Sequence, residues 1–404
     1  MNWLRSNPVA VIVLAQLFGT SLWFSPNSAA PDLVRAWQLS TTDLGYLTSS
    51  VQIGFILGTL LLATSGLADR FAASRIFALA SLLGAVLNGY FALGCNGLNQ
   101  AIATRFAVGL CLAGIYPLGM KMVIAWTKGN AGSTLGLLVA MLTLGTALPH
   151  GVRAAGADLS WQGVVLTSSV LAILGGVVIF LLGDGPFLVR SQHRPRIKWG
   201  AALMVFGQRN FRSCAMGYFG HMWELYAFWT IVPFLVTDLI IRAHVPAAIQ
   251  NTTISGLSFA IIGIGALGCV TAGFLSKRFG SPKVAAGALA LSGFICAIYP
   301  LFAQAGLVIA IAVLGIWGIA VIADSAQFSA VAARVCPPEL VGSALAIQNS
   351  VGFFITVLSI TLITSLVESL GSNVSWLLLP GPIVGLYFLR PLLGISPDQL
   401  KPST

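Results

Sequence analysis

The sequence predicts an all-α membrane protein with twelve transmembrane helices. Hydrophobic residues make up 57% of the 404 residues and charged residues only 8%, and the mean hydropathy is +0.91. A soluble domain carries about 25% charged residues. A chain this poor in charge cannot cover a water-exposed surface, so its outer surface must face lipid.

Apolar runs long enough to span a bilayer recur along the whole chain. A helix needs about 20 apolar residues to cross the hydrocarbon core. Twelve such runs, numbered here as helices 1 to 12, lie at residues 8–26, 42–64, 75–95, 98–124, 132–152, 161–182, 213–238, 252–275, 282–303, 305–333, 340–366 and 373–392.

One long polar connection, about residues 183–212, interrupts this pattern near the middle of the chain. Its basic residues include Arg190, Arg194, Arg196, Lys198 and Arg209. We therefore expect three parts. Residues 1–185 form an N-terminal six-helix half, residues 186–212 a basic cytoplasmic linker, and residues 213–404 a C-terminal six-helix half.

The net charge of +10 comes from basic residues in short loops between apolar runs, which is the pattern of the positive-inside rule. With a cytoplasmic N-terminus, only Arg35, Arg153 and Arg242 fall outside. We expect a multi-pass protein of a bacterial plasma (inner) membrane with both termini cytoplasmic, and no nucleic-acid partner. The basic residues that then lie inside, besides those of the linker, are Arg5, Arg70, Arg75, Lys128, Lys277, Arg278, Lys283, Arg334, Arg390 and Lys401.

Two short loops of similar sequence occupy the same place in the two halves. The first, residues 65–75, joins helices 2 and 3, and the second, residues 273–283, joins helices 8 and 9. The matching pairs are Leu67 with Leu275, Arg70 with Arg278, Phe71 with Phe279 and Arg75 with Lys283. Parallel repeats of this kind mark a large class of transporters, whose binding site lies between the halves.

These loops resemble motif A of the major facilitator superfamily, whose pattern is roughly G-x-L-a-D-R-x-G-R-K. The first copy departs from it at Ser65 and Ala72, and the second has Lys277 at the acidic position. Helix 4 partly resembles motif B through Arg105, Gly109 and Gly114. The resemblance implies two six-helix halves around a central cavity. It also implies a cytoplasmic gate formed by Asp69, Arg70, Arg75, Lys277, Arg278 and Lys283.

Ionisable residues inside the bilayer are costly and are therefore candidates for function. Those that the sequence places at membrane depth lie on helices 4, 7 and 10, and the resemblance makes these helices, with helix 1, the lining of the cavity. They are Arg105, Lys121, His221, Glu224 and Asp324. Lys121 points away from Arg105 and is expected either to extend to the cytoplasmic interface or to face Asp324.

Helix 7 is the richest in candidate residues. His221 and Glu224 are three residues apart and so share a face. A carboxylate in a partly dry cavity can exchange a proton near neutral pH, and Glu224 is the first candidate for proton coupling or substrate binding. Tyr226 follows as an aromatic contact for a substrate. On helix 1, Gln16 and Trp23 are expected to share one face, and on helix 4 Tyr116 is expected to share a face with Arg105.

The resemblance and these residues predict a monomeric secondary transporter of a small polar or anionic organic solute. Arg105 would attract the anionic group, and Glu224, His221 and Asp324 would exchange protons. Nitrate carriers are broadly similar, but their anion-clamping arginines on helices 2 and 8 are missing here. The alternatives are proton-driven efflux of drugs or metabolites, which a missing motif C disfavours, and transport of a metal ion.

A membrane enzyme or sensor is the alternative outside transport. The sequence has no HExxH, GxSxG or P-loop pattern, so no catalytic residues and no cofactor are predicted. The six cysteines are scattered without a CxxC pair and predict neither a disulfide framework nor a structural metal site.

Overall fold

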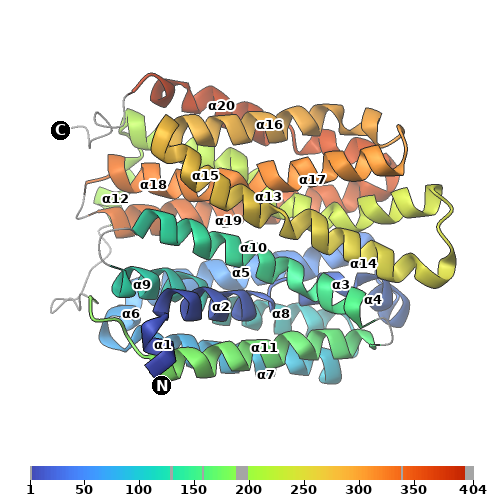
Figure 1. Ribbon diagram of the computed structural model, residues 1–404, viewed down its shortest axis with the longest axis horizontal. Coiled ribbons are helices and arrows are strands. Elements are labelled where there is room, and N and C mark those ends of the chain that lie inside the picture. The colour runs from blue at the N-terminus through green and yellow to red at the C-terminus, as the bar shows by residue number, and fades with distance from the viewer. Residues whose placement is uncertain (1, 128–130, 157–158, 188–198, 338–339, 396–404) are drawn as a thin grey trace.

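The computed structural model describes residues 2–127, 131–156, 159–187, 199–337 and 340–395. In these residues the chain forms helices only, and most run nearly parallel or antiparallel to the long axis of the molecule (Figure 1). The predicted all-α membrane fold is confirmed.

The first group of helices, which we call the N-terminal group, precedes the basic connection. Its elements are α1 (Asn2–Ser6), α2 (Pro8–Thr20), α3 (Ser25–Ser28), α4 (Ala30–Trp37), α5 (Thr41–Ser65), α6 (Leu67–Arg70), α7 (Ala73–Gly94), α8 (Leu98–Ala113), α9 (Tyr116–Trp126), α10 (Ala131–Ala155) and α11 (Trp161–Leu182).

The second group, the C-terminal group, follows a short helix, α12 (Trp199–Val205). Its elements are α13 (Arg209–Arg242), α14 (Ala247–Gly263), α15 (Gly265–Phe279), α16 (Ser281–Phe302), α17 (Leu307–Ala323), α18 (Ser325–Val335), α19 (Val341–Leu370), the 3₁₀ helix η1 (Gly371–Leu377) and α20 (Pro380–Leu393).

The number of membrane crossings agrees with the twelve predicted. In the described part of the chain, ten helical segments are long and apolar enough to cross a membrane, and α2 is a shorter apolar helix. The last of the ten, Val341–Leu393, contains both α19 and α20, which η1 separates.

Four predicted helices are interrupted, which the apolar pattern alone did not reveal. Helix 1 is broken between α2 and α3, and helix 4 between α8 and α9. A proline in the first turn of the second piece, Pro26 or Pro117, accompanies each of these breaks, because proline has no N–H and disfavours a helical residue before it. Helix 8 is interrupted at Ile264 and helix 10 at Asp324.

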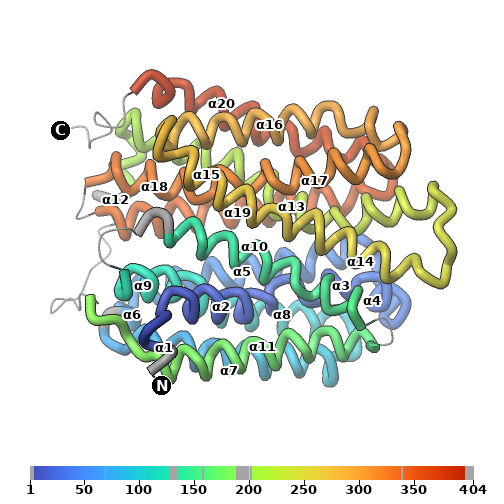
Figure 2. Tube along the Cα trace, viewed as in Figure 1, coloured from blue at the N-terminus to red at the C-terminus, as the bar shows by residue number. Residues whose placement is uncertain are grey.

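The two groups lie side by side, and Figure 2 shows the blue-to-green helices below the yellow-to-red ones. They contact each other through two pairs of long helices, α5 with α19 and α10 with α14, and α10 also packs on α15. Of the expected linker, residues 188–198 lie outside the described residues. The remainder includes α12 and the first residues of α13.

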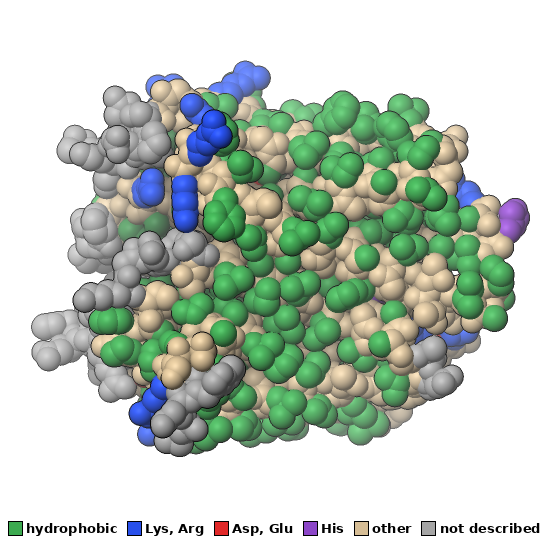
Figure 3. Space-filling model, viewed as in Figure 1, with side chains coloured by type: hydrophobic (Ala, Val, Ile, Leu, Met, Phe, Trp, Pro, Cys, Tyr) green, Lys and Arg blue, Asp and Glu red, His purple; other side chains and the backbone are tan. Residues whose placement is uncertain are grey.

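Basic side chains gather at one end of the bundle, at the left of Figure 3. We call it the basic end, and the opposite end the far end. Lys128, Lys401 and the linker residues Arg190, Arg194, Arg196 and Lys198 lie outside the described residues. The basic end carries Arg5, Arg70, Arg75, Lys277, Arg278, Lys283, Arg334 and Arg390, and the far end Arg35, Arg153 and Arg242.

Glycines allow α5 and α8 to approach each other closely. A Cβ atom added at Gly54 would lie 2.0 Å from the backbone oxygen of Phe106, and one at Gly109 would lie 2.2 Å from that of Val51. Backbone atoms cannot turn aside as a side chain can. Small residues at such positions let membrane helices pack without the hydrophobic driving force available in water.

We predict that Gly54→Ala destabilises the protein by about 1–3 kcal/mol, the usual range for overpacking, because α8 must move away from α5. Thermal unfolding of the purified protein in detergent should show a clearly lowered Tm. Gly273→Ala is the matched control, since a Cβ there meets nothing within 4 Å. Equal Tm values for the two variants would contradict this account of the contact.

Candidate functional site

A cavity of about 320 Å³ lies between the two groups of helices. The N-terminal group contributes residues of α5, α6, α8, α9 and α10, and the C-terminal group residues of α13, α17, α18 and α19. Its walls include Phe55, Thr59, Tyr116, Met120, Lys121, Tyr218, Met222, Tyr226, Ser325, Ser329, Asn349 and Phe353.

The lining of the cavity is mainly aromatic and aliphatic, with a few hydrogen-bonding groups. Three tyrosines, the hydroxyls of Thr59, Ser325 and Ser329, and the amide of Asn349 supply the polar contacts. Lys121 is the only charged residue among the described lining residues. Its Nζ atom donates a hydrogen bond to the backbone oxygen of Ala68 at 2.5 Å, which links α9 to α6. The cavity therefore combines a mostly apolar wall with one cation.

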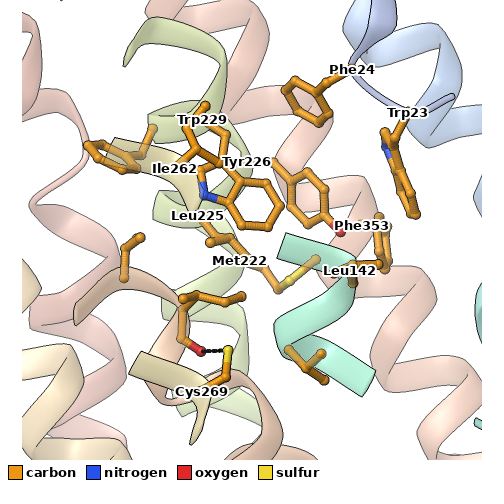
Figure 4. Packing of buried hydrophobic residues seen from close by; sticks show 14 of the residues in the cluster. Trp23, Phe24, Leu142, Met222, Leu225, Tyr226, Trp229, Ile262, Cys269 and Phe353 are labelled. Atoms are coloured by element: carbon orange, nitrogen blue, oxygen red, sulfur yellow. Dashed lines mark hydrogen bonds between the residues drawn. The ribbon is translucent and has the colours of Figure 1, made fainter. Parts of the chain in front are cut away.

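An aromatic cluster borders the cavity, and Figure 4 shows five of its members, Trp23, Phe24, Tyr226, Trp229 and Phe353. The ring of Trp23 lies 5.8 Å from that of Phe353 and 5.7 Å from that of Tyr226, so residues of both groups meet here. Phe24 and Trp229 extend the cluster toward the far end, with ring centroids 6.1 Å apart. The six members are Trp23, Phe24, Phe55, Tyr226, Trp229 and Phe353.

Beyond this cluster α5 and α19 are in direct contact at the far end. Ser49 and Thr361 are within 3.4 Å through their hydroxyl oxygens, and Thr41 donates to the carboxylate of Glu368. A Cβ at Gly45 would clash with the side chain of Thr364. The same two helices line the cavity with residues nearer the basic end. The cavity is thus closed at the far end and extends toward the basic end.

His221 and Asp324 form a buried pair in the C-terminal group. The Nδ1 atom of His221 lies 2.8 Å from a carboxylate oxygen of Asp324, and both side chains are 1% exposed. Asp324 occupies the break between α17 and α18. The His221 ring also packs against Tyr218 and Phe328. The pair therefore joins α13 to the one irregular point of helix 10.

Glu224 lies one turn farther along α13 and is 1% exposed. Its carboxylate accepts hydrogen bonds from the Nε1 atom of Trp317 at 2.6 Å and the hydroxyl of Ser292 at 2.9 Å. The thiol of Cys296 donates a third, at 3.3 Å. These donors come from α16 and α17, so Glu224 points away from the cavity and into the C-terminal group.

The three ionisable residues lie directly behind the cavity wall. His221, Glu224 and Asp324 are not among its lining residues, but their chain neighbours are: Met222 and Leu225 on α13, and Ile322 and Ser325 on either side of Asp324. His221 and Glu224 were expected to interact on one face of the helix, but they have separate partners. His221 contacts Asp324, and Glu224 contacts residues of α16 and α17. In the described residues, no three His, Cys, Asp or Glu side chains form a metal-binding group.

Arg105 does not line the cavity, in contrast to its expected role in attracting a substrate anion. It is 1% exposed and buried in the N-terminal group. Its Nη2 atom donates to the backbone oxygens of Leu22 and Trp23 at 2.8 and 2.7 Å, and Nη1 donates to the side chain of Asn88 at 2.9 Å. The break in helix 1 leaves those two carbonyls without helical partners, and Arg105 satisfies them.

The remaining candidates on the cavity helices fall into two sets. Tyr116 and Tyr226 line the cavity. Trp23 belongs to the aromatic cluster and donates from Nε1 to Gln52 at 3.2 Å. Gln16 is fully buried near Gly119 of α9, away from the cavity. The shared face expected for Gln16 and Trp23 is lost, because α2 ends at Thr20.

The residues of the expected gate lie at the basic end. Arg70, Arg75, Lys277, Arg278 and Lys283 are exposed, while the side chain of Asp69 lies outside the described residues. The backbone N–H of Ser74, at the start of α7, donates to the carboxylate of Asp184 at 2.9 Å. This bond ties the loop between α5 and α7 to the segment that follows α11.

Three buried polar residues of the N-terminal group were not among the predicted site residues. Asn88 of α7 bonds to Arg105, to Ser25 and to Ser169, and so connects α7 to three other segments. Gln52 bonds to Trp23, and His150 is buried on α10. An amide or imidazole inside an apolar run signals a partner across helices, but neither spacing nor composition says which partner.

A model of the Major Facilitator Superfamily matches residues 12–395 of the chain. Among solved structures, the chain is similar to a D-xylose-proton symporter, with a TM-score of 0.73, 14% identity and 98% of each chain covered. It is also similar to the nucleoside transporter NupG (TM-score 0.70, 13% identity, 96% of this chain and 99% of that one).

A third similar structure is a bacterial homologue of the human lysosomal transporter Spinster, in an inward-facing and occupied conformation. Here the TM-score is 0.65 and the identity 15%, with 96% of this chain and 94% of that one covered. No curated protein sequence matches the chain.

The fold and the cavity between two groups of helices are those of a multi-pass membrane transporter, and not of an enzyme. The chain belongs to the major facilitator superfamily.

We predict that Arg105→Gln destabilises the protein by about 1–3 kcal/mol, the cost of a buried unsatisfied polar group, because the carbonyl of Trp23 loses its donor, whereas that of Leu22 keeps the hydroxyl of Ser25 at 3.3 Å. Arg105→Lys should restore little, because one ammonium cannot reproduce the fork that reaches Asn88 and both carbonyls. The Tm of each variant is measured by thermal unfolding. Arg35→Gln, which removes an exposed arginine, is the control. A lysine variant as stable as the wild type would show that charge alone matters at this position.

Proposed function

We propose that the protein is a secondary active transporter that moves a small organic solute by alternating access and is driven by protons. One observation carries the proposal. A cavity between the two groups of helices is closed at the far end, and two buried carboxylates lie directly behind its wall. Binding at that wall and protonation behind it can thus act on the same helices, α13 and α17–α18.

We further propose that the transporter is a monomer in a bacterial inner membrane, with the basic end in the cytoplasm. Positive charge at one end supports this orientation (Figure 3). In that orientation the cavity faces the cytoplasm. Residues 1–185 and 213–404 are the two halves that move relative to each other, and residues 186–212 link them. The contacts of α5 with α19 at the far end are those that must separate in the outward-facing state.

The walls of the cavity support a solute with an apolar or aromatic body and a few hydrogen-bonding groups. The volume of about 320 Å³ lies at the lower end of ligand pockets, which run from about 300 to 1,000 Å³. Lys121 favours an anionic group on the solute, the role that the sequence assigned to Arg105. Two of the similar structures are named as a D-xylose-proton symporter and a nucleoside transporter. Sugars and nucleosides are therefore useful neutral test compounds.

Proton coupling is supported by the surroundings of Asp324. Its ionisable neighbours are His221 and Glu224 on α13 and Cys269 on α15. Protonation of Asp324 weakens its attraction to His221 at the point where helix 10 is already interrupted. A change there can alter the angle between α17 and α18, and α18 lines the cavity. Three donors hold the carboxylate of Glu224, which therefore anchors α13 against α16 and α17. The protonation state of Glu224 also contributes to the net charge of the group formed by His221, Glu224 and Asp324.

We predict that Asp324→Asn abolishes the response of transport to an imposed pH gradient, because the exchangeable proton is lost, while solute exchange at equal pH persists. Glu224→Gln should also lower the pH response and in addition lower the Tm, because the amide cannot accept all three hydrogen bonds. Asp238→Asn, an exposed site on the same helix, is the control.

The measurement is uptake into proteoliposomes with and without a pH gradient, screened over small acids, amines, sugars and nucleosides. Proton coupling would be wrong if no accepted solute responded to the gradient. An Asp324→Asn protein with an unchanged pH response, beside a defective Glu224→Gln protein, would assign the coupling to Glu224 instead.

We predict that Lys121→Gln raises the half-saturation concentration of anionic solutes about tenfold, equivalent to about 1.4 kcal/mol of lost attraction, and leaves neutral solutes nearly unchanged. Lys121→Arg should keep the preference for anions, because it keeps the charge. Arg334→Gln removes an exposed basic residue at the same end of the bundle, outside the expected gate, and serves as the control. Equal losses for neutral and anionic solutes would give Lys121 a structural role only.

Export of an amphipathic metabolite or drug is the second candidate function, and the aromatic lining favours it. The two directions differ in the sign of the coupling: an inward proton gradient accelerates loss of solute from loaded vesicles in antiport and accumulation of solute in symport. Transport of a metal ion has no supporting ligand cluster in the described residues.

A further inference from the structure

A second hollow of about 500 Å³ lies within the C-terminal group, outside the central cavity. Residues of α15 and α16 form its two sides, and α17, which packs against both helices, forms its floor. We call it the lateral groove. Its lining residues are Thr271, Ala272, Leu275, Phe279, Lys283, Val284, Gly287, Ala288, Leu291, Ile319, Ala320 and Ala323.

The lateral groove faces the bilayer. Leu275 and Phe279 on one side are each 48% exposed, and Leu291 on the other is 44% exposed. From Lys283 to Leu291 the groove follows α16 for about 12 Å, at about 1.5 Å per residue. Small residues make room for it: a Cβ at Gly287 would meet nothing within 4 Å. It is thus an open, mainly apolar groove that runs along α16.

One charged residue, Lys283, stands in the described lining, at the mouth of the groove at the basic end. An apolar channel with a cation at the membrane–water boundary is complementary to one class of molecule, an acyl chain that carries an anionic headgroup. Basic pockets between membrane helices on the cytoplasmic side favour such headgroups.

We propose that the lateral groove binds one anionic phospholipid, with an acyl chain between α15 and α16 and its phosphate group at Lys283. Inside a bilayer the acyl chain gains no hydrophobic energy from entering the groove, because the surrounding lipid is equally apolar. Selection of this lipid therefore comes from the headgroup charge, and packing contributes shape only. Charge recognition, rather than chain burial, is the property to test.

The lipid occupies a position from which it can influence transport. The floor of the groove includes Ala320 and Ala323 of α17, and Ala323 directly precedes Asp324, where helix 10 is interrupted. An acyl chain bound between α15 and α16 limits how far α17 can move relative to these two helices. The groove and the central cavity thus lie on opposite sides of the same helix break, since Ile322 and Ser325 face the cavity.

Native mass spectrometry of the full chain, with phosphatidylglycerol and phosphatidylcholine added in competition, tests the proposal. We expect one retained lipid, with phosphatidylglycerol preferred about fivefold, the effect of one lysine near an anionic surface. Lys283→Gln should reduce this preference to near unity. Gly287→Leu should fill the groove and remove the retained lipid of either kind, and the open space around Gly287 lets this variant fold.

Two control variants separate the groove from general effects. Lys277→Gln removes a neighbouring exposed lysine outside the groove, and Gly315→Leu adds the same bulk to α17 where a Cβ also meets nothing within 4 Å. Both should retain the lipid and its preference. Equal retention of the two lipids by the wild type, or an unchanged preference in Lys283→Gln, would overturn recognition of the anionic headgroup.

Retention of the lipid by Gly287→Leu would overturn the location. A concentration-dependent dimer that Gly287→Leu abolishes would show instead that a second copy of the chain covers the groove, and would also overturn the proposal. None of these outcomes depends on transport activity, so they stand apart from the test of proton coupling.

Discussion

Polar groups inside a bilayer must find partners within the protein, because lipid offers none. Several buried polar contacts of this chain follow from that requirement. The break in helix 1 frees two backbone carbonyls, and Arg105 binds both of them. The carboxylate of Glu224 accepts from an indole, a hydroxyl and a thiol, and Asp324 contacts His221. These irregular or charged points are thus tied to neighbouring helices around the cavity.

The same requirement separates structural polar residues from those that can meet a solute. Arg105 makes three hydrogen bonds within the N-terminal group and is not among the residues that line the cavity. Lys121, nearer the end of the same interrupted helix, lines the cavity and so presents the charge there. In the C-terminal group His221, Glu224 and Asp324 lie one layer behind the wall, where the proton exchange that we propose would act on helix packing and not on the solute directly. This arrangement separates solute binding from charge compensation, while α13 and helix 10 take part in both.

The sequence predicted the membrane class, the number of crossings and the concentration of ionisable residues on a few helices, and each of these depends on composition or on one-dimensional spacing. It did not predict the interrupted helices 1, 4, 8 and 10. Their apolar runs are continuous, and a proline near a break does not say whether the helix bends or stops. The prediction that Gln16 and Trp23 share one face was wrong because helix 1 is interrupted between these two residues. The pairing of His221 with Asp324 instead of Glu224 was also beyond reach, because spacing along one helix does not show which neighbour a side chain meets.

The sequence by itself determined that the chain crosses a membrane repeatedly and belongs with helical transporters, because the hydrocarbon core imposes a minimum length and apolarity on every crossing. Only the tertiary structure decided which polar residues line the cavity, which are used in holding broken helices together, and at which end the cavity closes. Those properties depend on contacts between residues far apart in the chain, such as Ser49 with Thr361 and Arg105 with Trp23. A buried polar side chain takes its role from the partner that the fold brings to it, and the pattern of its own helix does not identify that partner.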